Sequence, residues 1–358
     1  MNAILFLGDF FRDARCTNMA DSIIDDGQDL VIIHSGSGSE TYRGKTLYNI
    51  DLPSSGINKY WKFYQQSKEI LKGLSTTCII AGDLYSLPSA ASIHPPKLIY
   101  DSREIYSQLA GLVDSPIKQL FWSFIEKINI QKASMVVVTA DSDSEVLKSI
   151  YGDIPCITLK NLPSKKNLPT PPIDLYSKLN IPKTSPIFLY QGVLHQGRGI
   201  ELVLPLLETF QDAHYVVLGD GAYKNDFENL LRRYDVQHRV HCLGSIPYSE
   251  LLNHTASATI GFSLIEPLSQ SYEHALPNKI FEYAAAGIPV ITTDLPEMKN
   301  AITEFDLGHS VEFGNEMELI KAVERILSNS DDNRYEPNPQ LLWEAQAGDF
   351  LEIIDCYA

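Results

Sequence analysis

Cysteine is scarce in this 358-residue chain, and so are long apolar runs. The five cysteines are scattered, and no Cys-x-x-Cys pair occurs. This usage is typical of reduced thiols in a cytosolic protein, so we expect neither a disulfide framework nor a zinc site. No apolar run approaches the roughly 20 residues that a membrane-spanning helix needs. The opening "MNAILFLGDFFRD" has no basic region before its short apolar stretch, so we expect a first strand there and no signal peptide.

Basic residues are also few, with 29 Lys and Arg against 45 Asp and Glu and a formal net charge of -16. A protein that binds nucleic acid nonspecifically needs an excess of cations to replace phosphate counterions, so we expect no nucleic-acid partner. A broad basic membrane footprint is disfavoured for the same reason, although a local patch is compatible with these numbers. The hydrophobic content of 44% is ordinary for a globular protein, and the length favours two domains.

Short apolar segments alternate with helical patterns along the whole chain, which is typical of parallel sheets wrapped by helices. Four prolines within 161–174 predict a linker. We therefore expect an α/β fold with two doubly wound, Rossmann-like domains, 1–163 and 164–338, that face each other across a cleft. A helical tail, 339–358, can pack back across the hinge. The expected strands are 3–8, 29–36, 75–83, 96–102, 133–141, 186–192, 213–221, 239–245, 256–263, 287–294 and 308–314.

The segment "ALPNKIFEYAAAGIPVI", 275–291, predicts a short helix from Asn278 to Ala286 that ends at Gly287. Asn278 and Glu282 are four residues apart, so we expect them on one helix face. A helix N-terminus suits an anion, and a carboxylate can accept hydrogen bonds from two neighbouring hydroxyls. Together these features fit the pyrophosphate and ribose of a nucleotide. The alternative is an exposed helix face on which Glu282 and Lys279 are merely solvated.

This segment resembles the donor-site motif of family-4 glycosyltransferases with the GT-B fold, in the branch whose motif reads Leu-Pro-Asn-Lys-x-x-Glu-Tyr. Other segments are similar to the family's motifs in the same order, so the resemblance covers nearly the whole chain. It implies a retaining enzyme with a cleft between its two domains. The further similar segments are 10–33, 98–106, 136–152, 188–204, 216–231 and 240–252.

The resemblance implies that Glu282 holds the donor ribose, while Arg198 and Lys279 stabilise the diphosphate; we expect these three residues to be catalytic. Arg198 lies between two glycines just before a predicted helix, where backbone can approach an anion and a guanidinium can form forked hydrogen bonds. The segment "GDGAY", 219–223, lacks the third glycine of a dinucleotide fingerprint. The other expected donor-binding residues are Gly8, Gly219, Gly244, Ser245, His274, Pro277 and Asn278.

Three positions depart from the family pattern. Val193 stands where a second arginine is common, and His274 stands where an earlier glutamate often contacts the donor sugar. Arg103 stands where a histidine near the reacting sugar is common. On the acceptor or sugar side we expect Arg15, Asp101, Arg103 and Glu104; the alternative is a structural ion pair at the end of a strand. The loops 35–44 and 94–97 are further candidates for acceptor contact.

By this resemblance the chain transfers a hexosyl or N-acetylhexosaminyl group from a nucleotide-diphosphate sugar to a glycan or lipid-linked glycan in bacterial surface polysaccharide synthesis. It is expected to use no metal and no cofactor besides the donor, and to work in the cytoplasm or at the inner face of the cytoplasmic membrane. The alternatives are a non-hydrolysing nucleotide-sugar epimerase and a catalytically degenerate subunit that binds nucleotide-sugar.

The segment 115–133 is amphipathic, with Ile117, Phe121, Phe124 and Ile128 on one side. We interpret this stripe as core, which is the usual fate of an apolar stripe on a helix. The alternative is peripheral contact with a membrane.

Overall fold

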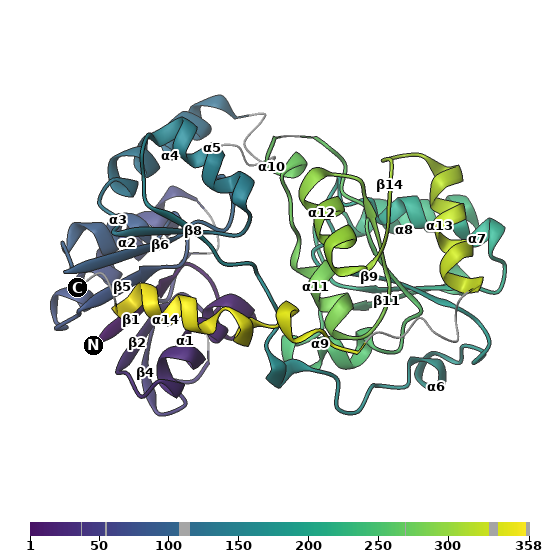
Figure 1. Ribbon diagram of the computed structural model, residues 1–358, viewed down its shortest axis with the longest axis horizontal. Coiled ribbons are helices and arrows are strands. Elements are labelled where there is room, and N and C mark those ends of the chain that lie inside the picture. Colours follow the sequence, from purple (N-terminus) through teal and green to yellow (C-terminus); the bar gives the residue numbers. More distant parts are fainter. Residues whose placement is uncertain (37, 54–55, 107–114, 269, 329–335, 356–358) are drawn as a thin grey trace. The chain divides into compact units, whose positions relative to one another are not determined.

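The computed structural model describes the chain except residues 37, 54–55, 107–114, 269, 329–335 and 356–358 (Figure 1). The chain divides into two compact units. Unit 1 comprises Met1–Asn161 and Trp343–Ala358, and unit 2 comprises Leu162–Leu342. The first boundary lies just before the one expected from the sequence. The expected tail is shared, since residues 339–342 belong to unit 2 and the rest to unit 1.

Unit 1 contains an eight-stranded sheet in the order β3-β4-β2-β1-β5-β6-β7-β8. Neighbouring strands are parallel, except for the antiparallel pair β3 and β4. The strands are β1 (Asn2–Phe6), β2 (Leu30–His34), β3 (Thr41–Tyr42), β4 (Lys45–Asn49), β5 (Cys78–Ala81), β6 (Lys97–Asp101), β7 (Met135–Val138) and β8 (Cys156–Thr158). The sequence did not predict β3, β4 or β8, and β3 lies inside the loop 35–44 that was a candidate for acceptor contact.

Alternate residues of the β1 strand enter two different cores, because successive side chains of a strand point to opposite faces of the sheet. One core is covered by α2 (Ile57–Lys72), α3 (Leu87–Ser92), α4 (Pro116–Ile130) and α5 (Asp141–Tyr151). The other is covered by α1 (Ala14–Asp25), η8 (Trp343–Ala345) and α14 (Ala347–Asp355), and Figure 1 shows α1 and α14 beside each other. A short helix, η1 (Phe10–Arg12), precedes α1.

The last segment of the chain is anchored to unit 1 by both apolar and polar contacts. Phe350 is fully buried, and the Trp343 indole donates a hydrogen bond of 2.8 Å to Ser22 Oγ. Lys97 Nζ donates to the carbonyl oxygens of Ile353 and Ile354, which are near the end of α14. A lysine at this point satisfies carbonyls that a helix C-terminus leaves without an intrahelical partner.

A buried ion network joins the carboxyl end of β6 to α1. Arg15, which is 1% exposed, contacts both carboxylate oxygens of Asp101 and donates to the carbonyl oxygens of Leu159 and Lys160. Arg103 bridges Asp101 and Asp13 at 2.8 and 2.5 Å. Arg15 and Asp101 were expected to contact acceptor or sugar. Both are instead buried and form a structural ion pair with each other.

The α4 helix corrects the expectation that its apolar stripe is core. Ile117, Phe121, Phe124 and Ile128 are 44–83% exposed. Glu126 lies on the opposite, inward face, and its two carboxylate oxygens accept hydrogen bonds of 2.7 Å from the hydroxyls of Tyr100 and Tyr151. Burial raises the pKa of Glu126, and the hydrogen bonds from the two tyrosine hydroxyls oppose this rise. These bonds offset part of the cost of burying a carboxyl group. Among the described residues, no helix is long and apolar enough to cross a membrane.

Unit 2 contains a six-stranded, entirely parallel sheet in the order β11-β10-β9-β12-β13-β14. The strands are β9 (Ile187–Gln191), β10 (His214–Leu218), β11 (Val240–Gly244), β12 (Ile260–Ser263), β13 (Val290–Thr293) and β14 (Gly308–Val311). All six lie within segments that the sequence predicts as strands. Their apolar side chains enter two cores, one on each face.

The helices of unit 2 follow the expected alternation with strands. They are α6 (Leu175–Leu179), α7 (Leu206–Thr209), α8 (Lys224–Tyr234), α9 (Tyr248–Thr255), α10 (Gln270–Glu273), α11 (Asn278–Ala285), α12 (Pro296–Phe305) and α13 (Glu316–Ser328). Shorter 3₁₀ helices are η4 (Lys165–Asn167), η5 (Ile200–Val203), η6 (Gln237–Arg239) and η7 (Pro339–Leu341).

We expect Arg15→Ala to destabilise unit 1 by about 3–5 kcal/mol, because it leaves the buried Asp101 carboxylate poorly compensated. All three tryptophans lie in unit 1, so denaturant unfolding followed by their fluorescence reports on this unit. The control is Arg43→Ala, which removes an exposed ion pair with Asp21 and Asp25 and is expected to cost under ~1 kcal/mol. Equal losses in the two variants would contradict a stabilising role for the buried network.

Candidate functional site

The strand order of unit 2 reverses between β9 and β12, where the chain leaves the central strand in two opposite directions. Ligands of doubly wound sheets bind beyond the carboxyl ends of the strands at such a switch point. Here β9 ends in Gln191 and is followed by Gly192. Gly219 N donates a hydrogen bond of 2.8 Å to Gly244 O, so the segments after β10 and β11 meet beside it. A Cβ atom on Gly219 would lie 1.8 Å from Gly192 O, which explains the glycine.

The α11 helix begins at Asn278, as expected, and ends one residue earlier than expected, at Ala285. Pro277 precedes it and provides no side-chain cap, and Gly287 follows in the left-handed region at φ 77°. Asn278 is exposed and Glu282 is only 7% exposed. Both residues lie in α11 four positions apart, so they share one helix face as expected, although only Asn278 is exposed. The alternative, an exposed helix face on which Glu282 and Lys279 are merely solvated, is wrong, because both side chains are buried.

The Glu282 carboxylate is held by side chains from β9 and α9. Gln191 Nε2 donates to Glu282 Oε2 at 2.5 Å, and the Thr255 hydroxyl donates to Gln191 Oε1 at 2.7 Å. Burial raises the pKa of Glu282, while hydrogen bonds from Gln191 and Tyr248 and the charge of Lys279 oppose this rise. The chain from Thr255 through Gln191 fixes the orientation of the carboxylate.

Lys279 lies over the face of the Tyr190 ring, with Nζ 3.9 Å from the ring centroid. Burial and the nearby Arg198 charge lower the pKa of Lys279 to about 7, although Glu282 acts in the opposite direction. No carboxylate of the described residues lies within 4.0 Å of this ammonium group. A buried ammonium with an aromatic face and no paired carboxylate is a strong attractor for an anion.

Arg198 supplies a second cation to this region. It is half-buried, and its guanidinium lies 4.9 Å from the centroid of the Tyr272 ring. Its positive charge helps to lower the pKa of Lys279. Gly199 has φ 65°, and a Cβ atom there would lie 1.9 Å from Leu264 O, so this sequence position requires glycine. Val193 is exposed and provides only its carbonyl, which accepts a hydrogen bond from the Tyr190 hydroxyl.

The remaining donor-side predictions are distributed over both units. Ser245 is exposed directly after β11, in the segment that leads to Tyr248. His274 is half-buried between α10 and α11, and its Nδ1 is buried without a hydrogen-bond partner among the described residues. Gly8 follows β1 in unit 1 and accepts a hydrogen bond from Ser35 N, so its expected approach to the donor phosphates stays a prediction.

Several site residues were missed by the sequence analysis: Gln191, Thr255, Tyr190, Tyr248 and Tyr272. The one available signal was a polar residue, Gln191, at the end of an otherwise apolar strand.

On the acceptor side, Arg103 and Asp101 form the structural ion pair that was given as the alternative, and Glu104 is exposed.

The sequence contains one Asp-x-Asp tripeptide, at Asp141 and Asp143. Asp143 accepts a hydrogen bond from the Thr139 hydroxyl, and Asp141 accepts one from Thr158. In the described part of the chain, no group of three or more His, Cys, Asp or Glu residues is arranged to hold a metal ion.

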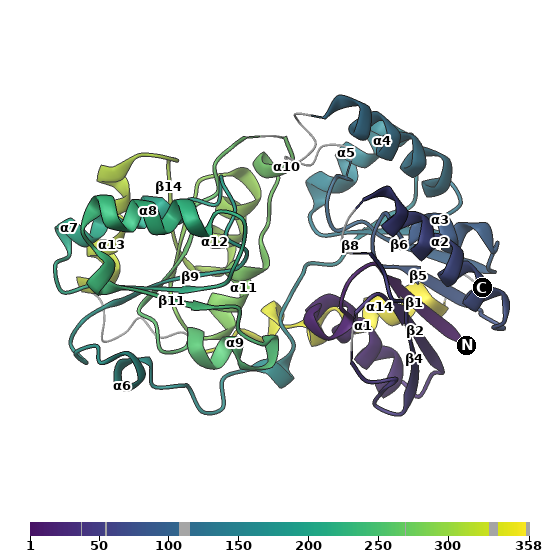
Figure 2. The ribbon, with the colours of Figure 1, turned by 180° about the vertical axis from the view of Figure 1, so that it is seen from behind.

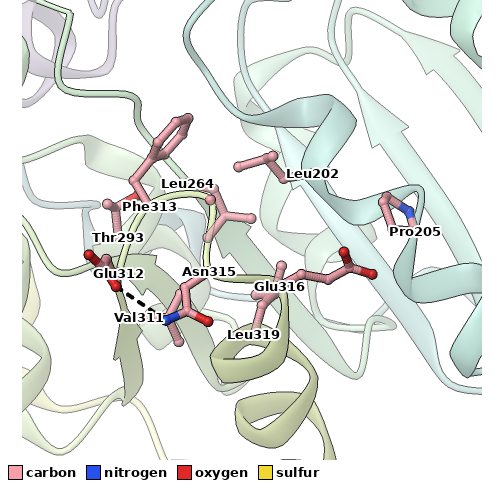
Figure 3. A pocket seen from close by; sticks show the side chains of 11 residues that line it. Leu202, Pro205, Leu264, Thr293, Val311, Glu312, Phe313, Asn315, Glu316 and Leu319 are labelled. Carbon is pink, nitrogen blue, oxygen red and sulfur yellow. Dashed lines mark hydrogen bonds between the residues drawn. The ribbon is translucent and has the colours of Figure 1, made fainter.

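A separate cavity of about 90 Å³ lies in unit 2 near the carboxyl ends of β13 and β14 (Figure 3). Its walls are mainly apolar, with Glu312 and Glu316 at the margin, and Glu312 accepts a hydrogen bond from Asn315. It is smaller than the ~300 Å³ typical of the smallest ligand pockets. Neither Arg198, Lys279 nor Glu282 lines it, so it is distinct from the switch-point site.

Glycosyltransferases are among the known proteins to which this chain is similar. Residues 174–338 match the family described as glycosyl transferases group 1. An uncharacterized glycosyltransferase of Methanocaldococcus jannaschii is 25% identical over 173 residues, which cover 45% of this chain. The match spans only 40% of the length of that relative.

Solved structures are similar over almost the entire chain. Sucrose-phosphate synthase of Thermosynechococcus elongatus superposes with a TM-score of 0.82 at 17% identity, covering 98% of this chain and 97% of the other. WaaG, a glycosyltransferase involved in lipopolysaccharide biosynthesis, gives a TM-score of 0.72 at 15% identity, with coverages of 100% and 96%. Anabaena HepE, solved with UDP and glucose, gives 0.70 at 12% identity, with coverages of 99% and 97%. These findings support a glycosyltransferase: the chain has the two-domain GT-B fold, and its residues 174–338 match glycosyl transferases group 1.

Proposed function

We propose that this protein is a retaining glycosyltransferase of family 4, in the Leu-Pro-Asn-Lys-x-x-Glu-Tyr branch. It transfers a hexosyl or N-acetylhexosaminyl group from a nucleotide-diphosphate sugar to a hydroxyl of a glycan or lipid-linked glycan. The proposal places it in bacterial surface polysaccharide synthesis, in the cytoplasm and at the inner face of the cytoplasmic membrane. The description of WaaG as a lipopolysaccharide enzyme and the UDP bound to HepE support this class of pathway and donor.

The observation that carries the proposal is the buried Lys279 at the switch point, with Glu282 one helical turn further along α11. The lysine has no paired carboxylate among the described residues, so a donor diphosphate would supply the missing counter-charge. In this proposal, the ribose next to that diphosphate presents its hydroxyls to Glu282, which lies three residues further along α11. Buried titratable groups of opposite charge at a binding edge are typical of functional sites.

In this mechanism, Arg198, Lys279 and the N-terminus of α11 stabilise the negative charge that develops on the departing diphosphate. Glu282 accepts hydrogen bonds from the ribose hydroxyls and fixes the position of the donor. The acceptor hydroxyl attacks from the face that the diphosphate leaves, and the leaving phosphate accepts its proton. Protein cations balance the charge of the diphosphate, so the proposal requires no metal and no further cofactor.

Removal of either key charge is expected to weaken donor binding. We expect Glu282→Ala to reduce affinity for the cognate nucleoside diphosphate about 100-fold, since two hydrogen bonds to a charged group are lost. Arg198→Ala is expected to reduce it about 10-fold through the lost guanidinium contacts. A thermal-shift screen with UDP, GDP and ADP identifies the nucleotide and is followed by calorimetry.

Matched controls are Glu304→Ala and Arg232→Ala, which remove an exposed acid on α12 and a base on α8. Both controls are expected to bind the nucleotide like the native protein. Unchanged affinity in both site variants would refute the proposed donor site.

The lowered pKa of Lys279 predicts that donor binding weakens with rising pH. Above about pH 7 the free protein loses the lysine proton that the diphosphate needs, so affinity should fall by up to about 10-fold per pH unit. The nucleotide itself is already fully ionised there, because its last phosphate pKa is about 6. Calorimetry in buffers of different ionisation enthalpy should also detect proton uptake.

In this pH series, Lys279→Arg should flatten the profile, since arginine keeps its proton. Lys279→Met should bind weakly and without this dependence. A native profile that stays level from about pH 7 to pH 9 would contradict the role of Lys279.

Gln191→Met is expected to move the acidic limit of donor binding to higher pH. The Gln191 amide lowers the pKa of Glu282, so its loss raises that pKa further, and the carboxylate is protonated at a pH where the native one is ionised. Affinity for the nucleoside diphosphate measured below about pH 7 reports this shift. A uniform loss of affinity at every pH would instead indicate general damage to the site.

A further inference from the structure

The outward face of α4 is apolar over its full length. Ile117, Leu120, Phe121, Phe124 and Ile128 follow the spacing of one helical face, and each is 44–83% exposed. The opposite face packs on the core of unit 1 through Ile130 and the hydrogen-bonded Glu126. Scattered exposed apolar residues are ordinary, but five on one helix face form a contiguous patch of the kind that marks an interaction surface.

The α2 helix extends this surface. The α3 helix packs against both α2 and α4, as Figure 2 also shows. Tyr60 of α2 contacts Trp122 of α4 at a ring-centroid distance of 4.9 Å, and Trp122 contacts Phe121 at 5.1 Å. On α2, Ile57 and Trp61 are 71% and 59% exposed. Aromatic side chains, tryptophan above all, favour the boundary between lipid and water.

The exposed charges of α4 are positive, although the whole chain carries -16. Lys118 and Lys127 of α4 are exposed, and they border the apolar stripe on opposite sides because each residue advances about 100° around an α-helix. Lys132 is exposed just beyond the helix end. The sole acid within the sequence of α4 is Glu126, which is buried and bonded to two tyrosine hydroxyls.

We propose that the exposed face of α4, extended by Ile57 and Trp61 of α2, binds the surface of an anionic phospholipid membrane with α4 lying in the plane of the interface. The apolar stripe inserts between the head groups, while the bordering lysines contact lipid phosphates. The charge pattern selects this occupant, because an acidic chain with a local basic and apolar face is complementary to anionic lipid. The inference deepens the proposed function by naming the membrane component beside which a lipid-linked acceptor would be met.

The test is cosedimentation of the full chain with vesicles of phosphatidylcholine alone or with one third phosphatidylglycerol. We expect binding to the anionic vesicles, weakening at high salt, and a blue shift in the emission of the exposed Trp61. The Trp61→Phe variant should lose most of that shift. Equal binding to the two kinds of vesicle would overturn the assigned recognition of anionic lipid.

Two double variants divide the apolar and the cationic contributions. Phe121→Ser with Phe124→Ser, and Lys118→Glu with Lys127→Glu, should each reduce affinity for anionic vesicles at least about 10-fold. The matched control on α13 of unit 2 is Met317→Ser with Lys321→Glu, which alters an exposed apolar residue and an exposed lysine outside the patch. It should bind like the native chain, and all variants should keep native circular dichroism and melting temperature.

Three results would overturn the proposal: no vesicle binding by the native chain, equal binding by the patch and control variants, or a dimer in solution that the Phe121 and Phe124 changes dissociate. The last result would assign the face to a second copy of the chain. Nucleoside diphosphate binding is measured without vesicles, so a failed donor site and a failed membrane surface are distinguishable.

Discussion

The candidate site depends on the burial of Lys279 against the Tyr190 ring without a paired carboxylate among the described residues. Withdrawal of an ammonium group from water is costly, and an aromatic face offsets only part of that cost. The lowered pKa of Lys279 is the direct consequence. Arg198 increases the strain because it adds a second positive charge. Such an arrangement is relieved by an anion, which is why the region is better explained as a binding site than as core.

The strand order explains why these groups meet. The reversal between β9 and β12 opens the sheet edge where Gln191 ends its strand, so a side chain from β9 can reach the helix that carries Glu282. The hydroxyl of Thr255, at the end of α9, donates a hydrogen bond to the oxygen of the same Gln191 amide. Each contact joins residues more than sixty positions apart, and only the folded topology brings them together. The site is therefore a property of the switch point as a whole, with α11 as one contributor.

The sequence was informative where local chemistry decides the outcome. Apolar β-branched runs located all six strands of unit 2, and Gly287 located the end of α11 to within one residue. It missed β3 and β4, whose short strands are partly polar, and it could not reveal the long-range contacts of Gln191. It was wrong about α4 because an apolar stripe was assumed to face inward. That helix is apolar on more than one side, and the side that carries Ile130 and the hydrogen-bonded Glu126 is the one that is buried.

Two buried glutamates with raised pKa values show how a structural carboxyl group differs from one suited to a ligand. Both oxygens of Glu126 accept hydrogen bonds from tyrosine hydroxyls, and it belongs to the wall of an apolar core. Glu282 is oriented by Gln191 and has a coupled cation one turn away that lacks its own carboxylate partner among the described residues. Burial and a raised pKa are common to both. The unmet charge next to Glu282, at an edge where sheets of this order bind ligands, is what distinguishes the site.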